Sequence, residues 1–350
     1  MIAFITLMIL VAALVSHMAR RGRFAARLVI VGNSPLARQL VTEISTHRHI
    51  RQRVAAVVDE PLERLGPIIE ETRPNRIVVA VADRRGRLPM RDLLDATVHG
   101  VVVEEGVECY ERLTGKIAIE ALTPSGLIAS RSFRKSHVDL AFGHAFSLVV
   151  AATALVVLSP VFAIVALAIK LDSPGPVFFV HDRVGLRARR FRMFKFRTMR
   201  PADGPTSEWV CDNGHRITRT GRWLRKYRLD ELPQLINVVR GELNLVGPRP
   251  HPVSNFELFS KKIPFYSLRS VVRPGLTGWA QVRQGYANNL EEETEKMRYD
   301  LYYIKHMSVW LDVWILLQTV RTIAAGRETP GPVPALEVAA CPTPLVDPRV

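Results

Sequence analysis

The chain has few cysteines and lacks the short motifs of metal-stabilised and nucleotide-hydrolysing proteins. Its three cysteines, Cys109, Cys211 and Cys341, are widely separated and show no zinc-site or disulfide-framework spacing. There is also no P-loop and no aromatic-rich RNA-binding motif. We therefore expect reduced thiols in a cytoplasmic setting, and neither a structural zinc site nor P-loop chemistry.

Positive charge and apolar residues are both abundant. The formal net charge is +15 at pH 7, and 48% of the residues are hydrophobic. Basic charge in such an apolar chain favours an anionic membrane as the partner over nucleic acid. At 350 residues the chain can form two domains of ordinary size.

An apolar run at Ile2–Val15 is followed by the basic residues Arg20, Arg21 and Arg23. The run is shorter than the roughly 20 residues of a comfortable membrane span. A signal peptide would carry its positive charges before the apolar run and not after it. We expect a short membrane helix within residues 1–23, with the following domain on the cytoplasmic side.

Residues 24–123 alternate β-branched runs with helical stretches. This alternation predicts a doubly wound, Rossmann-like α/β domain, joined to the rest of the chain by a linker at residues 124–136. The expected strands are Leu28–Val31, Val54–Val58, Ile77–Val81 and Val101–Val103, and the expected helices are Pro35–Ser45, Leu62–Glu71 and Met90–Val98.

The first turn of this domain only partly matches a dinucleotide-binding fingerprint. It keeps Gly32, but Ser34 and Ala37 stand where the next glycines would be, and Pro35 lies between them. These changes disfavour close approach of a pyrophosphate, although Asp59 ends the second strand where a ribose-binding acid could sit. We favour a domain without a nucleotide and leave the nucleotide-binding alternative open.

An almost unbroken apolar stretch covers Val138–Ile169 and contains Ser159 and Pro160. A proline inside a helix removes a hydrogen bond and kinks it. Because both flanks are basic, the segment either enters and leaves the membrane on one face or spans it with a tolerated proline. The flanking cations are Arg131, Arg134 and Lys135 before it, and Lys170, Arg183 and Arg187 after it.

Residues 175–199 form a basic block with interleaved phenylalanines, as expected for a surface on anionic lipid. If its last part is a strand, Lys195 and Arg197 share one face, so two cations would face a site. We expect the loop Asp203–Gly221 to cover that site, with His215 as a surface residue.

The segment Arg222–Pro250 carries the strongest chemical signal. The adjacent carboxylates Asp230 and Glu231 follow a group of cations and precede the rigid turn Gly247–Pro250. Acids at a helix start are common, because they face the positive end of the helix dipole. A carboxylate among arginines is also what attack on a phosphoryl group requires, since nucleophile and phosphate are both anions. The cations are Arg222, Arg225, Lys226 and Arg228.

Three features follow this segment. Phe256–Ile263 is expected to form an amphipathic interfacial piece, and the glycines of Arg273–Trp279 allow close approach to a ligand, with a plain surface turn as the alternative. Tyr299–Val320 is expected to be one interfacial helix, in which a buried Asp312 would need a cation or the metal site as partner. The tail, residues 327–350, is rich in proline and alanine, which predicts disorder.

Five ordered blocks give the chain a resemblance to the polyprenyl glycosylphosphotransferases, the bacterial sugar transferases also called monotopic phosphoglycosyl transferases. The resemblance implies a membrane-embedded α+β catalytic domain over residues 137–326 with interfacial helices and a re-entrant helix at about residues 138–170. That helix would break at Ser159 and Pro160. The blocks are GPVFFVHDRVG at Gly175–Gly185, FKFRTM at Phe194–Met199, LDELPQLINVVRGELNLVGPRP at Leu229–Pro250, RPGLTGWAQV at Arg273–Val282 and YDLYYIKHMSVWLDVWILLQT at Tyr299–Thr319.

The resemblance also implies a reaction. A sugar-1-phosphate would pass from a UDP-sugar to polyprenyl (undecaprenyl) phosphate through an intermediate on Asp230, releasing UMP and priming exopolysaccharide or O-antigen synthesis. Mg²⁺ would bind at Asp230 or Glu231, and Glu231 could instead position the incoming group. The expected phosphate contacts are Lys195, Arg197, Arg222, Arg249 and Arg273.

The expected setting is the cytoplasmic face of the inner membrane, with the lipid bilayer and a homo-oligomer as further partners. Where the family usually has Gln, this chain has His181, which puts any polar contact there in doubt. Two other functions stay open: a membrane-anchored nucleotide or redox sensor, and an inactive scaffold of the polysaccharide machinery. No residue of the sequence identifies the transferred sugar.

Overall fold

The computed structural model describes residues 26–46, 52–59, 65–81, 88–122, 136–200, 216–284 and 289–324, with a few single residues between 124 and 133. The chain divides into two compact units, Met1–Ile128 and Ala129–Val350. Several predictions concern residues outside the described ones: the N-terminal helix, the loop with His215, and the proline-rich tail.

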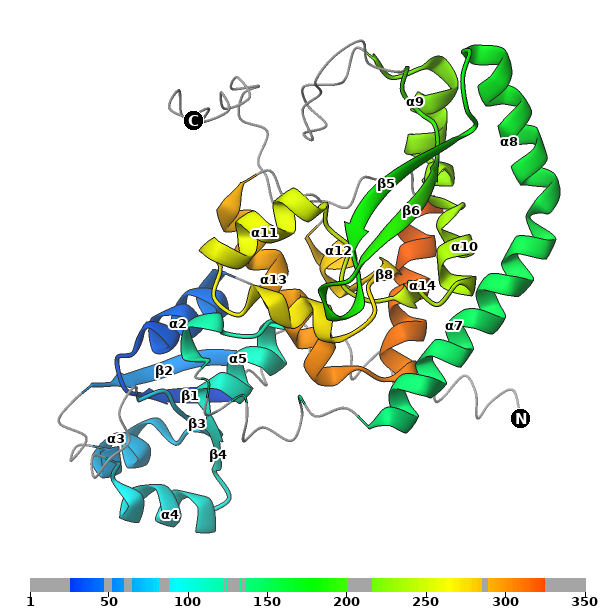
Figure 1. Ribbon diagram of the computed structural model, residues 1–350. Helices are drawn as coiled ribbons and strands as arrows, with labels where there is room; N and C mark the ends of the chain where they lie inside the picture. The colour runs from blue at the N-terminus through cyan, green and yellow to red at the C-terminus, as the bar shows by residue number, and fades with distance from the viewer. Residues whose placement is uncertain are drawn as a thin grey trace, which may run out of the picture. The chain divides into compact units, whose positions relative to one another are not determined.

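The first unit contains a four-stranded parallel sheet in the order β2-β1-β3-β4 (Figure 1). Helices α2 and α5 pack on one face of the sheet, and α3 and α4 pack on the other. The strands are β1 (Ala26–Val31), β2 (Gln52–Val58), β3 (Arg76–Val79) and β4 (Val102–Glu105), and the helices are α2 (Pro35–Thr46), α3 (Leu65–Thr72), α4 (Met90–Val98) and α5 (Gly106–Thr114).

Strand β1 explains why its sequence is an unbroken apolar run. Leu28 and Ile30 point to the α2 side, while Val29 and Val31 point to the α3 side, so all four of these residues are buried. The predicted parallel α/β sheet is confirmed, with each expected strand and helix within a few residues of its predicted place. Helix α5 was not predicted, because its nine residues begin with a glycine and follow β4 without a connecting loop.

The second unit begins with two consecutive apolar helices, α7 (His137–Val157) and α8 (Ser159–Asp172), which change direction where they meet (Figure 1). Helix α7 ends at Leu158, and Pro160 lies in the first turn of α8, where its missing N–H costs no helical hydrogen bond. The two helices therefore separate directly before Ser159 and Pro160, where the sequence led us to expect a break; re-entry into the membrane stays a prediction. A short 3-10 turn, η2 (Ile119–Ala121), precedes this unit in the chain.

Two polar side chains of α7 attach this apolar helix to the rest of the unit. His144 Nδ1 lies 2.9 Å from Asn244 Oδ1, and the Ser147 hydroxyl accepts a hydrogen bond from the Leu245 amide. Among the described residues one helix is long and apolar enough to cross a membrane, with its window at Leu140–Val157. That window has a mean hydropathy of 2.1 and is only 11% buried.

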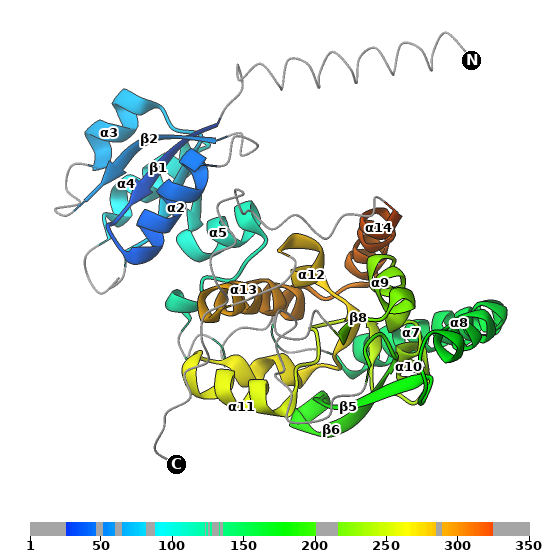
Figure 2. The same cartoon turned by 90° about the horizontal axis from the view of Figure 1, so that it is seen from above.

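Two small sheets and short helices form the body of this unit. Figure 2 shows α7 and α8 on one side of it and α11 and α13 on the other. The antiparallel hairpin consists of β5 (Phe178–Val184), η4 (Leu186–Ala188) and β6 (Arg190–Phe196). It is followed by α9 (Arg219–Lys226), η6 (Leu229–Glu231), α10 (Gln234–Val239), β7 (Asn244–Val246), α11 (Val253–Lys262), η7 (Tyr266–Val271), β8 (Gly275–Thr277) and α12 (Trp279–Arg283), and β7 pairs with β8 in the second sheet.

The last two helices, α13 (Leu290–His306) and α14 (Val309–Ala324), correct the expectation of one helix over Tyr299–Val320. The chain leaves the helical conformation at Met307, and the Ser308 hydroxyl accepts a hydrogen bond from the Leu311 amide at the start of α14. The apolar pattern continues across this break, so periodicity alone could not reveal it. The expected amphipathic piece at Phe256–Ile263 is helix α11.

Candidate active site

The adjacent carboxylates lie on the 3-10 turn η6, between α9 and α10. Arg228, just before the turn, has a left-handed backbone conformation with φ +56°, and this conformation separates the turn from α9. The side chains of Asp230 and Glu231 are buried, with whole-residue exposures of 8% and 7%. Two adjacent buried carboxylates need compensating charge.

Glu231 obtains that charge from two cations. Its Oε1 accepts hydrogen bonds from Lys195 Nζ at 3.0 Å and from an Arg249 guanidinium nitrogen at 2.7 Å. Burial by itself would raise the pKa of Glu231, but Arg249 and Lys195 outweigh it and hold the pKa well below its ordinary value. Burial lowers the pKa of Lys195, and Glu231 opposes this effect. Glu231 is therefore ionised at neutral pH.

Asp230 differs from its neighbour. Its Oδ1 is buried and has no hydrogen-bond partner among the described residues. Burial raises the pKa of Asp230, the charge on Glu231 raises it further, and Lys195, Arg228 and Arg225 lower it. A buried carboxylate oxygen with a raised pKa and no hydrogen bond is a stronger nucleophile than a solvated one.

Helix α9 supplies cations to this region because its start packs tightly against the residues after β6. A Cβ atom added to Gly221 would lie 2.1 Å from the Thr198 carbonyl oxygen, so a larger residue does not fit. Arg225 Nε donates to the Thr198 hydroxyl at 3.0 Å, which keeps this cation near Asp230. Arg222, by contrast, is exposed on α9.

The turn Gly247–Pro250, which carries Arg249, crosses the segment Arg273–Trp279 backbone to backbone. The Gly275 amide donates to the Pro248 carbonyl at 2.9 Å, and the Gly247 amide donates to the Thr277 carbonyl at 2.9 Å. A Cβ atom on Gly275 would lie 2.0 Å from the Gly247 nitrogen. These glycines therefore serve contact between two chain segments, and not the approach to a ligand that the sequence led us to expect.

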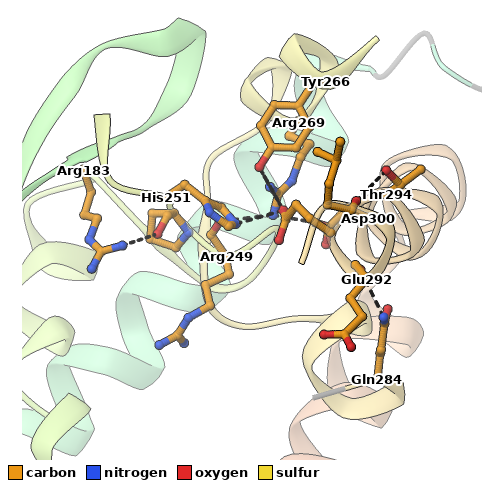
Figure 3. Close-up of polar contacts among 12 residues, drawn as sticks. Arg183, Arg249, His251, Tyr266, Arg269, Gln284, Glu292, Thr294 and Asp300 are labelled. Atoms are coloured by element: carbon orange, nitrogen blue, oxygen red, sulfur yellow. Dashed lines mark hydrogen bonds and ion pairs between the residues drawn. The ribbon is translucent and has the colours of Figure 1, made fainter. Parts of the chain in front are cut away.

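A buried polar cluster fixes the backbone of Arg249 from the other side (Figure 3). Arg269 pairs with Glu293 at 3.0 Å and with Asp300 at 2.7 Å, and it also donates to the Arg249 carbonyl at 3.3 Å. The Tyr266 hydroxyl donates to Glu293 at 2.9 Å and accepts a hydrogen bond from Arg269. Figure 3 shows the Arg249 side chain directed away from this cluster.

His251 lies at the edge of the same cluster, with Nε2 3.3 Å from Glu293 Oε1. Burial lowers the pKa of His251 well below its ordinary value, and the nearby Arg269 lowers it further. The imidazole is therefore neutral at pH 7, and Arg269 compensates the carboxylates. Burial raises the pKa of Asp300 to about 6, although Arg269 opposes this effect.

Two of the expected phosphate contacts lie elsewhere. Arg197 follows the end of β6, and its guanidinium donates to the carbonyls of Ser173 and Pro174 at 2.6 and 2.9 Å, so it caps the C-terminus of α8. Arg273 Nε donates to the Gly241 carbonyl at 3.1 Å. The structure brings Lys195 and Arg249 to the carboxylate pair, but not Arg197 or Arg273.

Arg225 and Arg228 were missing from the expected site residues although both act on Asp230. Their signal was present, since they belong to the group of cations just upstream of the pair. Arg222 was preferred within that group because the sequence does not show which side of so short a helix faces the pair.

Asp312 also has a partner other than the expected one. The Tyr303 hydroxyl donates to Asp312 Oδ1 at 2.8 Å. The expectation of a cation or a metal site for Asp312 was wrong, because the hydroxyl of Tyr303, on the preceding helix α13, is its partner.

For Mg²⁺ the residues offer a limited donor set. Among the described residues no group of three or more His, Cys, Asp or Glu side chains could hold a metal. Mg²⁺ commonly binds through one or two carboxylates, with water and substrate phosphates completing its shell. The partnerless Oδ1 of Asp230 fits that role, whereas Oε1 of Glu231 is already bound by two cations.

In the first unit, the start of the partial dinucleotide fingerprint is occupied by protein. A Cβ atom on Gly32, which has φ +107°, would lie 2.8 Å from the Ala80 carbonyl oxygen, so this glycine serves the packing of β1 against β3. The Asn33 amide donates to the Asp59 carboxylate at 2.8 Å. Contacts within the protein therefore account for Gly32 and Asn33, and the domain without a nucleotide stays a prediction.

The second unit matches a known protein family. Residues 138–326 match the family described as "Bacterial sugar transferase". The chain is 41% identical over 217 residues to a UDP-N-acetylgalactosamine-undecaprenyl-phosphate N-acetylgalactosaminephosphotransferase of Aeromonas hydrophila, covering 62% of this chain and 51% of the relative.

Two further relatives have related names. An undecaprenyl-phosphate glucose phosphotransferase of Komagataeibacter xylinus is 32% identical over 320 residues, covering 85% of this chain and 59% of the relative. A UDP-glucose:undecaprenyl-phosphate glucose-1-phosphate transferase of Escherichia coli (strain K12) is 40% identical over 188 residues, covering 53% of this chain and 40% of the relative. The chain thus spans between two fifths and three fifths of the length of these relatives.

Proposed function

The chain belongs to the bacterial sugar transferase family, and on this premise we propose that it transfers a sugar-1-phosphate from a UDP-sugar to undecaprenyl phosphate. The names of the relatives support this acceptor and this class of donor. The observation that carries the proposal is the buried, partnerless Oδ1 of Asp230 within a group of cations.

The proposed reaction has two displacements at one phosphorus atom. The Asp230 carboxylate attacks the β-phosphorus of the UDP-sugar, the bond to the oxygen bridging the two phosphorus atoms breaks, and UMP leaves with that oxygen. A phosphate oxygen of the lipid then attacks the same phosphorus and displaces Asp230. The product is a polyprenyl diphosphate sugar, and the carboxylate is regenerated without net proton transfer.

Charge balance explains why the substrate phosphates can enter. Four cations, Lys195, Arg225, Arg228 and Arg249, act on the two carboxylates, so the group keeps an excess of positive charge. That excess compensates the phosphoryl oxygens as the nucleophile approaches. Glu231 holds Lys195 and Arg249 in place before the substrate arrives.

When bound, Mg²⁺ would offset the negative charge of the donor diphosphate. Asp230 is the residue that would hold it, together with substrate oxygens and water. Arg249 and Lys195, the cations bound to Glu231, would contact the phosphates of the donor. We retain Arg222 as a weaker candidate for a phosphate contact. It is exposed on α9, and Arg225 lies one turn further along the same helix.

The proposed location is the cytoplasmic face of the inner membrane, where UDP-sugars and lipid phosphates meet. The exposed apolar surface of α7 and α8 supports insertion into lipid, and the break at Leu158 supports re-entry on one face. The product of such a reaction would prime the synthesis of an exopolysaccharide or O-antigen.

The test is covalent labelling with a UDP-sugar carrying a radiolabel in its β-phosphate. Wild-type protein should retain label after denaturation and release UMP, whereas Asp230→Asn should do neither. Asp182→Asn, an exposed aspartate on β5, is the matched control and should label normally. Normal labelling of Asp230→Asn would exclude Asp230 as the nucleophile, and absence of UMP release from all UDP-sugars would exclude the transfer.

A further inference from the structure

A partly enclosed cavity of about 110 Å³ lies beside the turn of the β5–β6 hairpin. Its walls come from five parts of the second unit: the hairpin turn, the first turn of α7, the start of β7, the segment around Arg273, and the break between α13 and α14. We call it the Arg187–Arg273 cavity. Its lining residues are Leu140, Leu186, Arg187, Asn244, Val271, Val272, Arg273 and Met307.

This cavity is positively charged and lacks an acidic residue. Arg187 and Arg273 are its charged lining residues, and no carboxylate lines it. No hydrogen bond or ion pair joins the Arg187 guanidinium to any described residue, and Arg273 uses Nε for the Gly241 carbonyl. Two guanidinium groups beside apolar walls attract an anion more strongly than they would in open solvent.

The backbone holds Arg187 at the cavity in a costly conformation. Arg187 has φ 53° and Ala188 has φ 57°, so two consecutive non-glycine residues are left-handed. This conformation is unfavourable for residues that carry a Cβ atom. The turn is closed by hydrogen bonds of the Gly185 amide to the Arg189 carbonyl and of the Arg189 amide to the Leu186 carbonyl. Such an outlier is more often retained where it serves a ligand.

Apart from Asn244, whose Oδ1 pairs with His144 Nδ1, the remaining walls are apolar, and they determine what kind of anion fits. Leu140, Leu186, Val271, Val272 and Met307 offer hydrocarbon and no donor or acceptor side chain. At about 30 Å³ per water molecule, the volume corresponds to a few waters, enough for a phosphate group with its first carbon atoms. Leu140 is also the first residue of the apolar window of α7.

We propose that the Arg187–Arg273 cavity binds the phosphate group of an amphiphile, with the first part of its hydrocarbon chain against the apolar walls. This site is separate from the carboxylate pair. Strand β6 begins at Arg190, just after the hairpin turn that carries Arg187. Lys195, which binds Glu231, lies five residues further along the same strand, a distance of about 17 Å. The inference does not depend on the proposed transfer reaction, and it gives Arg273 a different anion from the one the sequence suggested.

The test is calorimetric titration of the full chain in an uncharged detergent with three probes: decyl phosphate, dioctanoyl phosphatidylglycerol and inorganic phosphate. At least one amphiphile should bind at least tenfold more tightly than inorganic phosphate. Arg187→Gln should weaken that binding about tenfold, as expected for loss of one charge-assisted contact of ~1.4 kcal/mol or more. Binding of decyl phosphate alone would indicate a lipid monophosphate, and binding of both amphiphiles a bilayer phospholipid.

Arg189→Gln is the matched control, since Arg189 is exposed in the same turn but does not line the cavity. It should bind like the wild type, and so should Asp230→Asn, which separates this site from the carboxylate pair. Equal weakening by Arg187→Gln and Arg189→Gln would reduce the effect to general charge and overturn the proposal. Inorganic phosphate binding as tightly as the amphiphiles would overturn it as well.

Discussion

At the scale of single residues, the site depends on two neighbouring carboxylates having different environments. Glu231 is bound by Lys195 and Arg249, and its pKa falls, while Asp230 keeps a partnerless oxygen and its pKa rises. Neighbouring groups whose pKa values move apart can take different roles. Here one carboxylate organises the cations, and the other is available to react.

The raised pKa of Asp230 predicts an acid limit to activity. As the proposed nucleophile, Asp230 must be ionised to react, so the labelling rate should fall as the pH drops through a midpoint above 3.8, the ordinary value. Lys195→Met removes a cation that lowers this pKa, so its midpoint should move to higher pH, while Lys195→Arg should leave it nearly unchanged. Pre-steady-state labelling rates measured from pH 4 to pH 8 would check this, and identical profiles for the two variants would contradict it.

The same shift predicts an effect of Asp230 on stability. A carboxyl group whose pKa is raised by folding adds stability at low pH, and this contribution is lost as the pH rises through the folded-state value. Ionised Asp230 should therefore destabilise the protein at neutral pH. In the same pH series, Asp230→Asn should unfold at a higher temperature than the wild type at pH 7 and at a similar temperature near pH 4.

Residue-scale placement is also where the sequence was least informative. Alternation along a strand predicted that Lys195 and Arg197 share a face, but β6 ends at Phe196, and the chain then turns Arg197 to the end of α8. Arg273 was expected at a phosphate because glycines follow it, yet those glycines allow two backbone segments to cross. Both outcomes depend on contacts between segments far apart in the chain, which spacing does not encode.

At the scale of secondary-structure elements, buried polar contacts set the position of the turn that carries Arg249. The Arg249 carbonyl accepts a hydrogen bond from Arg269. Arg269 also joins η7 to α13, because it pairs with Glu293 and Asp300. All three of these side chains are buried. The cluster therefore connects the helices behind the site to the backbone from which Arg249 reaches Glu231.

Arg269→Met should be strongly destabilising, because it leaves two buried carboxylates without their cation. Removing one partner of a buried ion pair costs about 3–5 kcal/mol, and about 2–4 °C of midpoint corresponds to 1 kcal/mol in a domain of this size. We expect the thermal midpoint in detergent to fall by roughly 6–20 °C. The fall should be larger at pH 8 than at pH 6, because Asp300, with a pKa of about 6, is more fully ionised at pH 8.

Arg190→Met is the control for that measurement. Arg190 pairs with Glu257 at 3.5 Å, and both side chains are more than 60% exposed. Exposed pairs contribute about 0–1 kcal/mol, so its midpoint should hardly change. Similar shifts for Arg190→Met and Arg269→Met would show that the buried cluster contributes no more than a surface pair.

Elements with a strong local pattern were predicted well. The central strands β1 and β3 of the first unit are short apolar runs buried on both faces, and the break between α7 and α8 follows from Pro160. The break between α13 and α14 was missed because apolar residues recur at helical spacing on both sides of Met307 and Ser308. The carboxylate pair with Lys195 and Arg249 was anticipated through the family resemblance, which linked segments that no local pattern joins.

At the scale of the whole molecule, the question is on which side of a membrane each part of the chain lies. Helices α7 and α8 contain 21 and 14 residues, which at about 1.5 Å per residue gives lengths of roughly 31 and 21 Å. Together they exceed the roughly 30 Å of a bilayer's hydrocarbon core. A straight crossing would therefore leave much of α8 outside the hydrocarbon, although its residues are as apolar as those of α7.

A bend between α7 and α8 inside the bilayer would keep both helices in the hydrocarbon. It would also return the chain to the face from which it entered. Basic residues at both ends then lie on the cytoplasmic side, in agreement with the distribution of Lys and Arg in membrane proteins. The residues before α7 and the carboxylate pair after α8 would then share the compartment that contains UDP-sugars. We therefore expect Ser136 and Pro176, which flank the two helices and are exposed, on the same side.

Cysteine labelling of the full chain can test this topology. In a background with the three native cysteines replaced by serine, Ser136→Cys and Pro176→Cys should each react with a membrane-impermeant maleimide in inverted vesicles and not in intact spheroplasts. Val157→Cys, exposed at the end of α7, should react in neither, because lipid would cover it. Reaction of the two flanking positions from opposite sides would mean that α7 and α8 span the bilayer, and the carboxylate pair would then face the opposite compartment from the residues before α7.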